Sequence, residues 1–362
     1  MNAGKEPRKV ERPVDPRRYV PPHIAAMEGY VPGEQPRGGP IVKLNTNENP
    51  YPPSPKVREA LAAAIGDRLR LYPDPTALAF RETAAALHGV DPDMILAGNG
   101  SDDALTIVTR AFVGPGDAAA YPTPSYLLYS TLVKLQNGVE RLVPFDASWR
   151  LDVDGFAQPG LKLAYLANPN SPSGTALAPA EVAGLAERLD CPLVVDEAYA
   201  EFARENCVSL VKTHPNVIVT RTFSKAYGLA GIRLGYLIAD AALVRELNKV
   251  KDSYNCDALS QAAGKAALLD QAYLAETRAR ILASRDRLTA ALRELGWTVP
   301  DSQTNFVWAT DGAPAEATFQ ELKNRGVLVR LMRYPGHPAG LRISVGTDEE
   351  IDRLLQVLRE LA

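Results

Sequence analysis

Cysteine and histidine are scarce in this sequence, and where they occur they form no recognisable cluster. The 362 residues include three cysteines and four histidines. Cys191, Cys207 and Cys256 are odd in number and form no C-x-x-C pair, so neither a disulfide framework nor a zinc site is predicted. The histidines are far apart and form no H-E-x-x-H motif, so we interpret them as surface or loop residues and expect no metal.

A long apolar run and a strong net charge are also missing. No apolar stretch approaches the ~20 residues of a membrane-spanning helix, and residues 1–30 carry charge and proline where a signal peptide has an apolar core. A cytoplasmic location is therefore expected. The net charge of −3 favours neither nucleic acid nor an anionic membrane as a partner. A basic run within residues 8–18 is interpreted as a solvated arm, with a nucleic-acid contact as the weaker alternative.

The composition that is present, 46% hydrophobic and 23% charged, is that of a globular protein, and the length suits two domains. Residues 1 to about 40 are rich in proline, glycine, arginine and glutamate, and are predicted to form an extended arm. We divide the chain into an arm with a small-domain segment (1–45), a large domain (46–270) and a small C-terminal domain (271–362).

The pattern of apolar runs predicts an α/β fold. Between residues 50 and 270, short apolar runs without polar alternation are separated by helical patterns, which indicates a mostly parallel sheet covered by helices on both faces. The candidate strands are residues 94–97, 118–121, 163–167, 193–195, 217–220 and 234–239, and the candidate helices include 102–112, 126–134, 179–189 and 241–251. After residue 270 a smaller α+β unit is predicted, with helices at 273–295, 315–325 and 349–361 and strands at 305–309, 327–330 and 341–345.

The sequence T-R-T-F-S-K-A-Y-G-L-A-G-I-R-L-G-Y at residues 220–236 is the most informative segment. It begins at the end of a predicted strand, where ligands collect in open α/β sheets. Lys225 supplies an amine that can condense with an aldehyde, while Ser224 and Arg233 can bind the phosphate of the same molecule. A single lysine in a loop is usually only solvated, and it is the S-K-x-x-G-x-x-G-x-R-x-G spacing that favours the chemical role.

Asp196 ends the apolar run of residues 193–195, so its carboxylate is expected to be partly buried and to need a partner. A protonated pyridine nitrogen is one such partner, and Tyr199, three residues later, can donate to a phenolic oxygen. The alternative is that Asp196 only caps the following helix. Two loops, residues 98–103 and 168–174, also follow predicted strands; the first is interpreted as an anion cradle, while each alone is equally typical of an ordinary turn.

The order N-P-N-x-P-[ST]-G, D-E-A-Y and T-x-S-K-A-x-G-L-A-G-x-R resembles the fold type I aminotransferases and, among them, the histidinol-phosphate aminotransferase branch. The resemblance extends from about residue 28 to the C-terminus. Further matching motifs are Y-V-P-G-E-Q-P at 30–36, L-N-T-N-E-N-P at 44–50, R-L-Y-P-D at 70–74, G-N-G-S-D at 98–102, and L-R-I-S-V-G-T at 341–347.

The resemblance implies pyridoxal 5′-phosphate as the cofactor, held in the 46–270 domain. Lys225 would carry it as a Schiff base, with Asp196 on the pyridine nitrogen and Tyr199 and Asn170 on the phenolic oxygen. The other implied cofactor contacts are Gly100, Ser101, Asp102, Ser224, Arg233 and, from a second subunit, Tyr72 for the phosphate, with Tyr126 stacked on the ring. The implied substrate-binding residues are Tyr30, Asn47, Arg330 and Arg342. One departure is Ser171, where the family usually has asparagine; the phenolic-oxygen contact then passes to Asn170, passes to the Ser171 hydroxyl, or is lost.

The implied activity is ping-pong transamination of histidinol phosphate with 2-oxoglutarate in histidine biosynthesis, by a homodimer with shared active sites. Two alternatives on the same scaffold stay open: an aromatic aminotransferase, and a decarboxylase of a phosphorylated amino acid. An alternative of another class is a regulator that retains an aminotransferase-like domain, for which the N-terminal arm is too short to hold a DNA-binding domain.

Overall fold

The computed structural model describes residues 15–29 and 41–361. The chain divides into two compact units, Met1–Val31 and Pro32–Ala362, which are described separately. In the first unit, residues 15–29 contain the 3-10 helix η1 (Pro16–Tyr19) and the one-turn helix α1 (Pro22–Ala25). Each begins on a proline, whose missing N–H costs nothing at a first helical position. The prediction of an extended backbone is therefore wrong for Pro16–Tyr19 and Pro22–Ala25.

The second unit is built around a seven-stranded sheet with the order β2-β8-β7-β6-β5-β3-β4. Neighbours from β7 to β4 are parallel, while β8 is antiparallel to both β2 and β7. This confirms the predicted α/β class with a mostly parallel sheet. The strands are β2 (Ile95–Gly98), β3 (Ala118–Thr123), β4 (Val139–Pro144), β5 (Leu161–Ala167), β6 (Leu193–Asp196), β7 (Val217–Thr222) and β8 (Gly235–Ile238). The sequence did not predict β4, because this edge strand is largely exposed and lacks a continuous apolar run.

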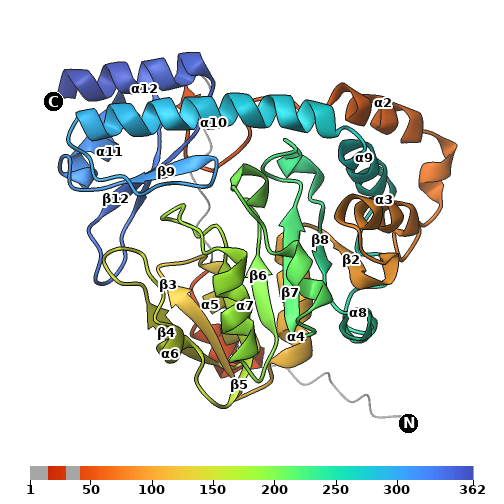
Figure 1. Cartoon of the computed structure of the whole chain (residues 1–362). Coiled ribbons are helices and arrows are strands. Elements are labelled where there is room, and N and C mark those ends of the chain that lie inside the picture. The colour runs from red at the N-terminus through yellow and green to blue at the C-terminus, as the bar shows by residue number, and fades with distance from the viewer. Residues whose placement is uncertain (1–14, 30–40, 362) are drawn as a thin grey trace, which may run out of the picture. The chain divides into compact units, whose positions relative to one another are not determined.

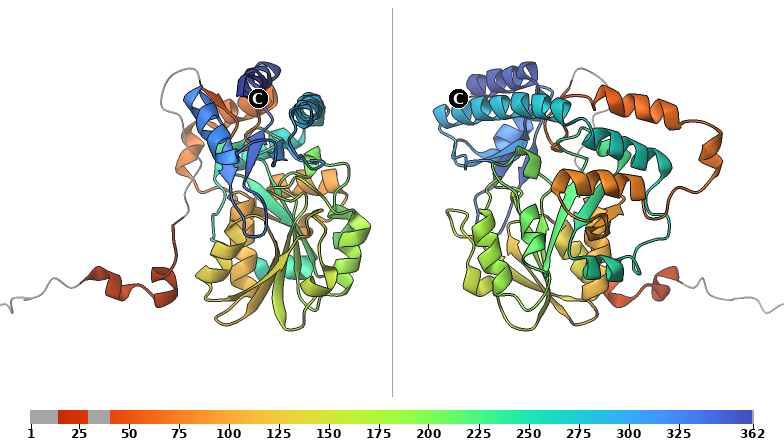
Figure 2. Two further views of the ribbon diagram at one scale, coloured as in Figure 1. Left: turned by 90° about the vertical axis from the view of Figure 1, so that its left-hand side faces the viewer. Right: turned by 45° about the vertical axis from the view of Figure 1, so that its right-hand side comes forward.

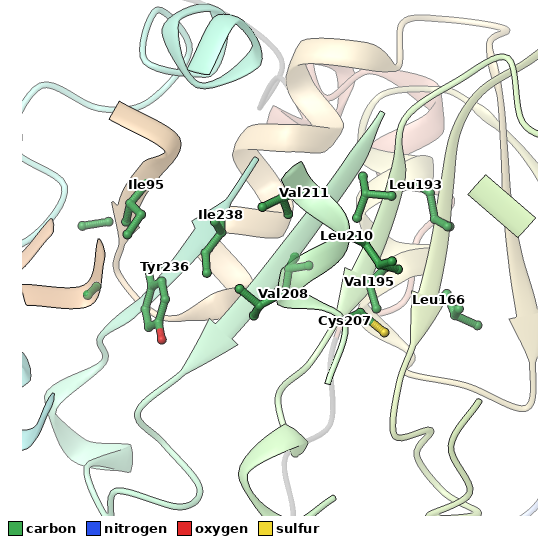
Figure 3. Close-up of a cluster of buried hydrophobic side chains, with 14 of the residues drawn as sticks. Ile95, Leu166, Leu193, Val195, Cys207, Val208, Leu210, Val211, Tyr236 and Ile238 are labelled. Carbon is green, nitrogen blue, oxygen red and sulfur yellow. The ribbon is translucent and has the colours of Figure 1, made fainter. Parts of the chain in front are cut away.

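Side chains of this sheet alternate between two hydrophobic clusters, one on each face. Figure 1 shows α7 on one side of the sheet, and Figure 3 shows part of the cluster on that face, where Leu193, Val195 and Ile238 from the strands lie near Val208, Leu210 and Val211. Helices packed on this face are α2 (Pro55–Ala64), α3 (Leu78–His88), α7 (Pro179–Glu187) and α9 (Ala258–Leu268). Those on the opposite face are α4 (Ser101–Phe112), α5 (Leu128–Leu135) and α8 (Ala241–Leu247).

The shorter connections contain further turns of helix. They are α6 (Val153–Phe156) and the 3-10 helices η2 (Asp67–Arg70), η3 (Pro92–Met94), η4 (Ala200–Phe202), η5 (Val208–Lys212) and η6 (Ala230–Ile232). Of these, η4 directly follows Tyr199, and η6 ends immediately before Arg233. Both turns therefore lie beside residues that the sequence singled out.

The C-terminal part has its own hydrophobic cluster around a three-stranded antiparallel sheet, β11-β12-β9. Its elements are α10 (Gln271–Glu294), β9 (Phe306–Ala309), α11 (Ala315–Asn324), β10 (Val327–Leu328), β11 (Arg330–Met332), β12 (Gly340–Ser344) and α12 (Asp348–Leu361). Figures 1 and 2 show α10 as one long helix with α12 beside it. The single strand predicted at 327–330 is two strands, because β10 pairs instead with β1 (Val42–Lys43). The predicted domain boundaries after residues 45 and 270 stay predictions.

Within the part of the chain that the structure describes, no helix is long and apolar enough to cross a membrane. No group of three or more His, Cys, Asp or Glu side chains in those same residues is arranged to hold a metal ion. Cys191, Cys207 and Cys256 are buried and unbridged.

Candidate active site

The residues that the sequence singled out gather at one edge of the large sheet. Because the parallel strands point the same way, their carboxyl ends lie together. Arg233 reaches the same edge because it precedes β8, which runs in the opposite direction. The strand ends lead to Gly100–Asp102 after β2, Tyr126 after β3, the 168–174 loop after β5, Asp196 on β6, and Ser224 and Lys225 after β7.

The N-terminus of α4 forms an anion cradle with Arg233. Gly100, at the N-cap, has a φ of 92° and offers no side-chain cap, so the first N–H groups of the helix have no intrahelical partner. Arg233 Nη1 donates to Ser224 Oγ at 3.0 Å, and its Nη2 lies 3.5 Å from Asp102 Oδ2. A Cβ on Gly100 would approach Arg233 Nη2 to 2.9 Å. Backbone N–H groups, a hydroxyl and a guanidinium thus converge, as a bound phosphate requires.

Asp196 is 4% exposed and has two hydroxyl partners. Tyr129 Oη donates to Oδ2 at 2.8 Å and Thr220 Oγ1 donates to Oδ1 at 3.1 Å, while the backbone N–H of Ala198 lies 3.3 Å from Oδ1. Burial raises the pKa of this carboxyl, and the two hydroxyl bonds oppose that rise. No α-helix begins directly after Asp196, so its side chain is not a helix cap.

Lys225 lies in the turn after β7 and is half-buried. Its Nζ donates to the carbonyl oxygen of Thr46 at 3.3 Å and lies 5.8 Å from the centroid of the Tyr199 ring. The Tyr199 hydroxyl in turn accepts a hydrogen bond from Asn47 Nδ2 at 2.9 Å. The Lys225 amine thus lies between Thr46 and Tyr199. The hydrogen bonds of this group join residues that are 152 or more positions apart in the chain.

Arg342 approaches this group from the small sheet. Its Nη1 donates to Ser171 Oγ at 3.2 Å, and its Cζ lies 5.4 Å from the centroid of the Phe306 ring, whose edge meets Tyr199 at 5.1 Å between centroids. Its Nε is buried and has no hydrogen-bond partner among the described residues. Since an unpaired buried donor on a cation is costly, the guanidinium is suited to an incoming anion.

Comparison with known proteins decides the family. The sequence profile described as "Aminotransferase class I and II" matches residues 39–358. The chain belongs to this aminotransferase family. The histidinol-phosphate aminotransferase of Rhodopirellula baltica is 50% identical over 93% of this chain and 94% of its own length. That of Syntrophotalea carbinolica is 48% identical over 94% and 98%. The crystal structure of the Sinorhizobium meliloti enzyme in complex with pyridoxal 5′-phosphate superposes with a TM-score of 0.85, at 30% identity, over 94% of this chain and 98% of that one.

Asn170 and Tyr126 are tied to protein partners in this aminotransferase. Asn170 Nδ2 donates to the carbonyl of Pro124 and to Ser173 Oγ, and its Oδ1 accepts from Ser125 Oγ. The contact with a phenolic oxygen predicted for Asn170 would require one of these bonds to break. Tyr126 donates to Asp102 Oδ1 at 3.1 Å, so it orients the carboxylate beside Arg233.

Of the predicted site residues that the structure describes, Tyr72 lies apart from this cluster. Tyr72 is 81% exposed, and its ring stacks on Tyr254 with 4.4 Å between centroids. Tyr30 lies outside the described residues. The roles predicted for Tyr72 and Tyr30 stay predictions.

Several residues that organise the aminotransferase site were not predicted from the sequence. Tyr129 and Thr220 hold Asp196, and neither belongs to a motif from which that contact follows. Behind them, the buried Arg221 on β7 pairs with Glu197 at 3.1 Å and with Glu201 at 2.8 Å. Burial raises the pKa of Glu197 to about 7, against the effect of Arg221. The D-E motif contains Glu197 and the T-R-T motif contains Arg221, and their opposite charges at the ends of the neighbouring strands β6 and β7 are the clue to this pairing.

Proposed function

We propose that this aminotransferase transfers the amino group of histidinol phosphate to 2-oxoglutarate, giving imidazole-acetol phosphate and glutamate in histidine biosynthesis, with pyridoxal phosphate as its cofactor. The names of the R. baltica and S. carbinolica relatives, at 50% and 48% identity over nearly the whole chain, support the substrate. The pyridoxal 5′-phosphate in the crystal structure of the S. meliloti enzyme supports the choice of cofactor.

The donor set of the site fits pyridoxal phosphate. Lys225 offers an amine for its aldehyde. The backbone N–H groups of Ser101 and Asp102 at the start of α4, together with Arg233, offer N–H donors for its phosphate, while the Gly100 N–H donates to the Gly98 carbonyl. The buried Asp196 offers a carboxylate for its ring nitrogen. When bound, the cofactor withdraws electrons from the bonds at the substrate's Cα.

The protein's own residues hold and move protons around that centre. The Asp196 carboxylate would keep the proton on the ring nitrogen, and the hydroxyls of Tyr129 and Thr220 hold the carboxylate in place. Lys225 would act as the general base and acid that moves the proton of the substrate's Cα. The Tyr199 hydroxyl would donate a hydrogen bond to the phenolic oxygen. Such positioning makes the proton transfer effectively unimolecular.

The observation that carries the choice of substrate is the pairing of Arg330 with Arg342 across β11 and β12. Histidinol phosphate has a phosphate and no α-carboxylate, whereas glutamate has two carboxylates. Two adjacent guanidinium groups can bind either kind of anion with planar, bidentate donors. Tyr30, predicted to add a hydroxyl to the phosphate, lies outside the described residues.

The proposal includes a homodimer in which Tyr72 of each subunit completes the phosphate site of the other. The exposure of the stacked pair Tyr72 and Tyr254, together with exposed Leu69, Leu71 and Leu78 in the same part of the chain, supports an interface there. The cytoplasmic location stays a prediction.

Half-reaction spectroscopy tests the proposed function. The purified protein loaded with pyridoxal phosphate is mixed in turn with histidinol phosphate, glutamate, phenylalanine and tyrosine, and the conversion of the cofactor to its amine form is followed by absorbance. We expect histidinol phosphate and glutamate to convert it fastest. Faster conversion by phenylalanine or tyrosine would favour the aromatic aminotransferase. Release of CO₂ from a phosphorylated amino acid added in the same way would favour the decarboxylase.

A further inference from the structure

Three hydrogen bonds join Ser344 on β12 to Tyr199 through Asn47. Ser344 Oγ donates to Asn47 Oδ1 at 3.1 Å and accepts from the Asn47 backbone N–H at 2.8 Å. Asn47 Nδ2 donates to Tyr199 Oη at 2.9 Å. Asn47 is 1% exposed and Ser344 is 3% exposed, so water does not compete for these groups. The series is continuous and runs from the small sheet to the active site.

The backbone of Asn47 is built for this arrangement. Its φ of 56° lies in the left-handed region, which asparagine tolerates better than most residues. Its carbonyl oxygen accepts from Nδ2 of Asn305, which is fully buried. The carbonyl of the preceding residue, Thr46, accepts from Lys225 Nζ. The side chain of Asn47 is therefore held from several directions, and the same turn of backbone contacts the reactive amine.

We propose that Asn47 and Ser344 are positioning residues that fix the direction and strength of the hydrogen bond donated by Tyr199. The inference rests on the proposed function, in which the phenolic oxygen of the cofactor accepts that bond. A phenol has one proton to donate, and Asn47 Nδ2 has no lone pair to accept it. The Tyr199 proton therefore points away from Asn47. Accepting a hydrogen bond also polarises the hydroxyl and makes it a better donor.

The charged and titratable groups around Tyr199 come from several elements. Lys225 lies over its ring, and Asp196 precedes it on β6. Tyr126, after β3, has its pKa raised in part by Tyr199. Arg342 from β12 also packs against Phe306. None of these supplies the hydrogen bond that Asn47 gives to the Tyr199 oxygen, so loss of Asn47 or Ser344 is not compensated by a neighbour.

The test measures the pH at which the lysine-linked cofactor loses half of its yellow absorbance. In the yellow form, the nitrogen that links the cofactor to Lys225 carries a proton that the phenolic oxygen shares. A hydrogen-bond donor to the phenolic oxygen competes with that proton and so favours the form in which the linkage nitrogen is deprotonated. A weaker donor therefore raises the midpoint. We expect Ser344→Ala and Asn47→Asp each to raise it by roughly half a unit to one unit, and Tyr199→Phe to raise it further. Asn47→Gly should also raise the midpoint, and glycine tolerates the positive φ of this position.

Two comparisons separate positioning from a general structural effect. Ser344→Thr keeps a hydroxyl and should therefore keep the wild-type midpoint. In the Tyr199→Phe background, Ser344→Ala should add no further shift, because the bond that it supports is already gone. An equal shift with and without the Tyr199 hydroxyl, or no shift in Ser344→Ala and both Asn47 variants, would overturn the inference.

The result also separates this inference from the proposed function. If the wild-type protein forms no yellow adduct with pyridoxal phosphate, or forms the same adduct after Lys225→Ala, the proposed function fails. If the adduct forms on Lys225 and the Ser344 and Asn47 variants leave its midpoint unchanged, only the positioning role fails.

Discussion

Arg330 and Arg342 lie directly opposite each other on the antiparallel strands β11 and β12. Like charges in this position normally destabilise a sheet. Both also act on Tyr334, whose pKa burial raises to about 12 while the two guanidinium charges oppose the rise. The protein thus keeps two cations on one face of a small sheet, and one of them, Arg342, contacts Ser171 and Phe306. Such an arrangement is useful where an anion binds between them.

Removal of Arg330 should separate the two substrates, whereas removal of Arg342 should not. We expect Arg330→Ala to raise KM for histidinol phosphate by roughly tenfold or more, with a smaller effect on glutamate, since one charged hydrogen bond contributes about 1.5–3 kcal/mol. Arg342→Ala should impair both half-reactions. Steady-state kinetics with each substrate measures the effects, with the exposed Arg359→Ala on α12 as a control. Equal losses for phenylalanine and histidinol phosphate in Arg330→Ala, with phenylalanine the better wild-type substrate, would contradict the assignment.

Lys225→Ala should abolish the covalent attachment of the cofactor. The reason is that the side chain provides the nucleophilic amine, and turnover should fall by several orders of magnitude. Borohydride reduction followed by mass spectrometry measures the attachment, with Lys249→Ala, an exposed lysine paired to Glu246, as the control. A reduced adduct that persists on another lysine at wild-type yield would show that Lys225 is not the attachment site.

Loss of the Tyr129 hydroxyl should make the Asp196 carboxylate easier to protonate while leaving the carboxyl group in place. In Tyr129→Phe the carboxyl loses a donor, so its pKa, already raised by burial, rises further and protonation sets in at higher pH. We expect activity to fall about tenfold and the acidic limb of the pH–rate profile to move to higher pH.

Asp196→Ala should retain the cofactor through the phosphate cradle, yet its rate of proton transfer should fall roughly 10²–10⁴-fold. The checks are pH–rate profiles and cofactor titrations; near-normal turnover of Asp196→Ala would refute the role.

Shared active sites predict complementation between two inactive variants. Tyr72→Ala and Lys225→Ala homodimers should each be impaired, whereas a hybrid dimer has one site with both residues intact. Random exchange should therefore restore about a quarter of the wild-type activity, because half of the dimers are hybrids with one good site of two. Activity after mixing, with exchange followed by differently tagged subunits, is the measurement. Full exchange without recovery would argue against Tyr72 acting across an interface.

His88 should make stability depend on pH. Burial lowers its pKa to about 4, and its Nε2 lies 2.8 Å from Tyr236 Oη. The unfolded chain, with a histidine pKa near 6.5, binds the proton more readily. Stability is therefore fully present above pH 6.5 and is lost as the pH falls towards 4, by on the order of 1–3 kcal/mol. Denaturant unfolding of wild type and His88→Gln across this range measures it; parallel pH dependences would exclude His88 as the cause.

Much of the fold followed from local pattern. Continuous apolar runs such as those of β6 and β7 are buried on both faces of a parallel sheet, and this pattern alone predicted the α/β class. Edge strand β4 escaped prediction because exposure on its outer side removes the apolar run. The segment 327–330 was predicted as one strand because sequence pattern does not say which neighbour a residue pairs with.

The active-site residues likewise include some that the sequence predicted and some that it did not. Strand-end motifs by themselves determined where Asp196, Ser224 and Lys225 lie, because parallel strands bring their carboxyl ends to one edge. Only the tertiary structure decided which side chains complete them. Tyr129 reaches Asp196 from a helix 67 residues earlier, and Asn47 meets Ser344 across 297 residues. Such contacts depend on strand register and helix packing, which no local sequence pattern encodes, so the partners of the reactive groups are set by how distant segments fit together.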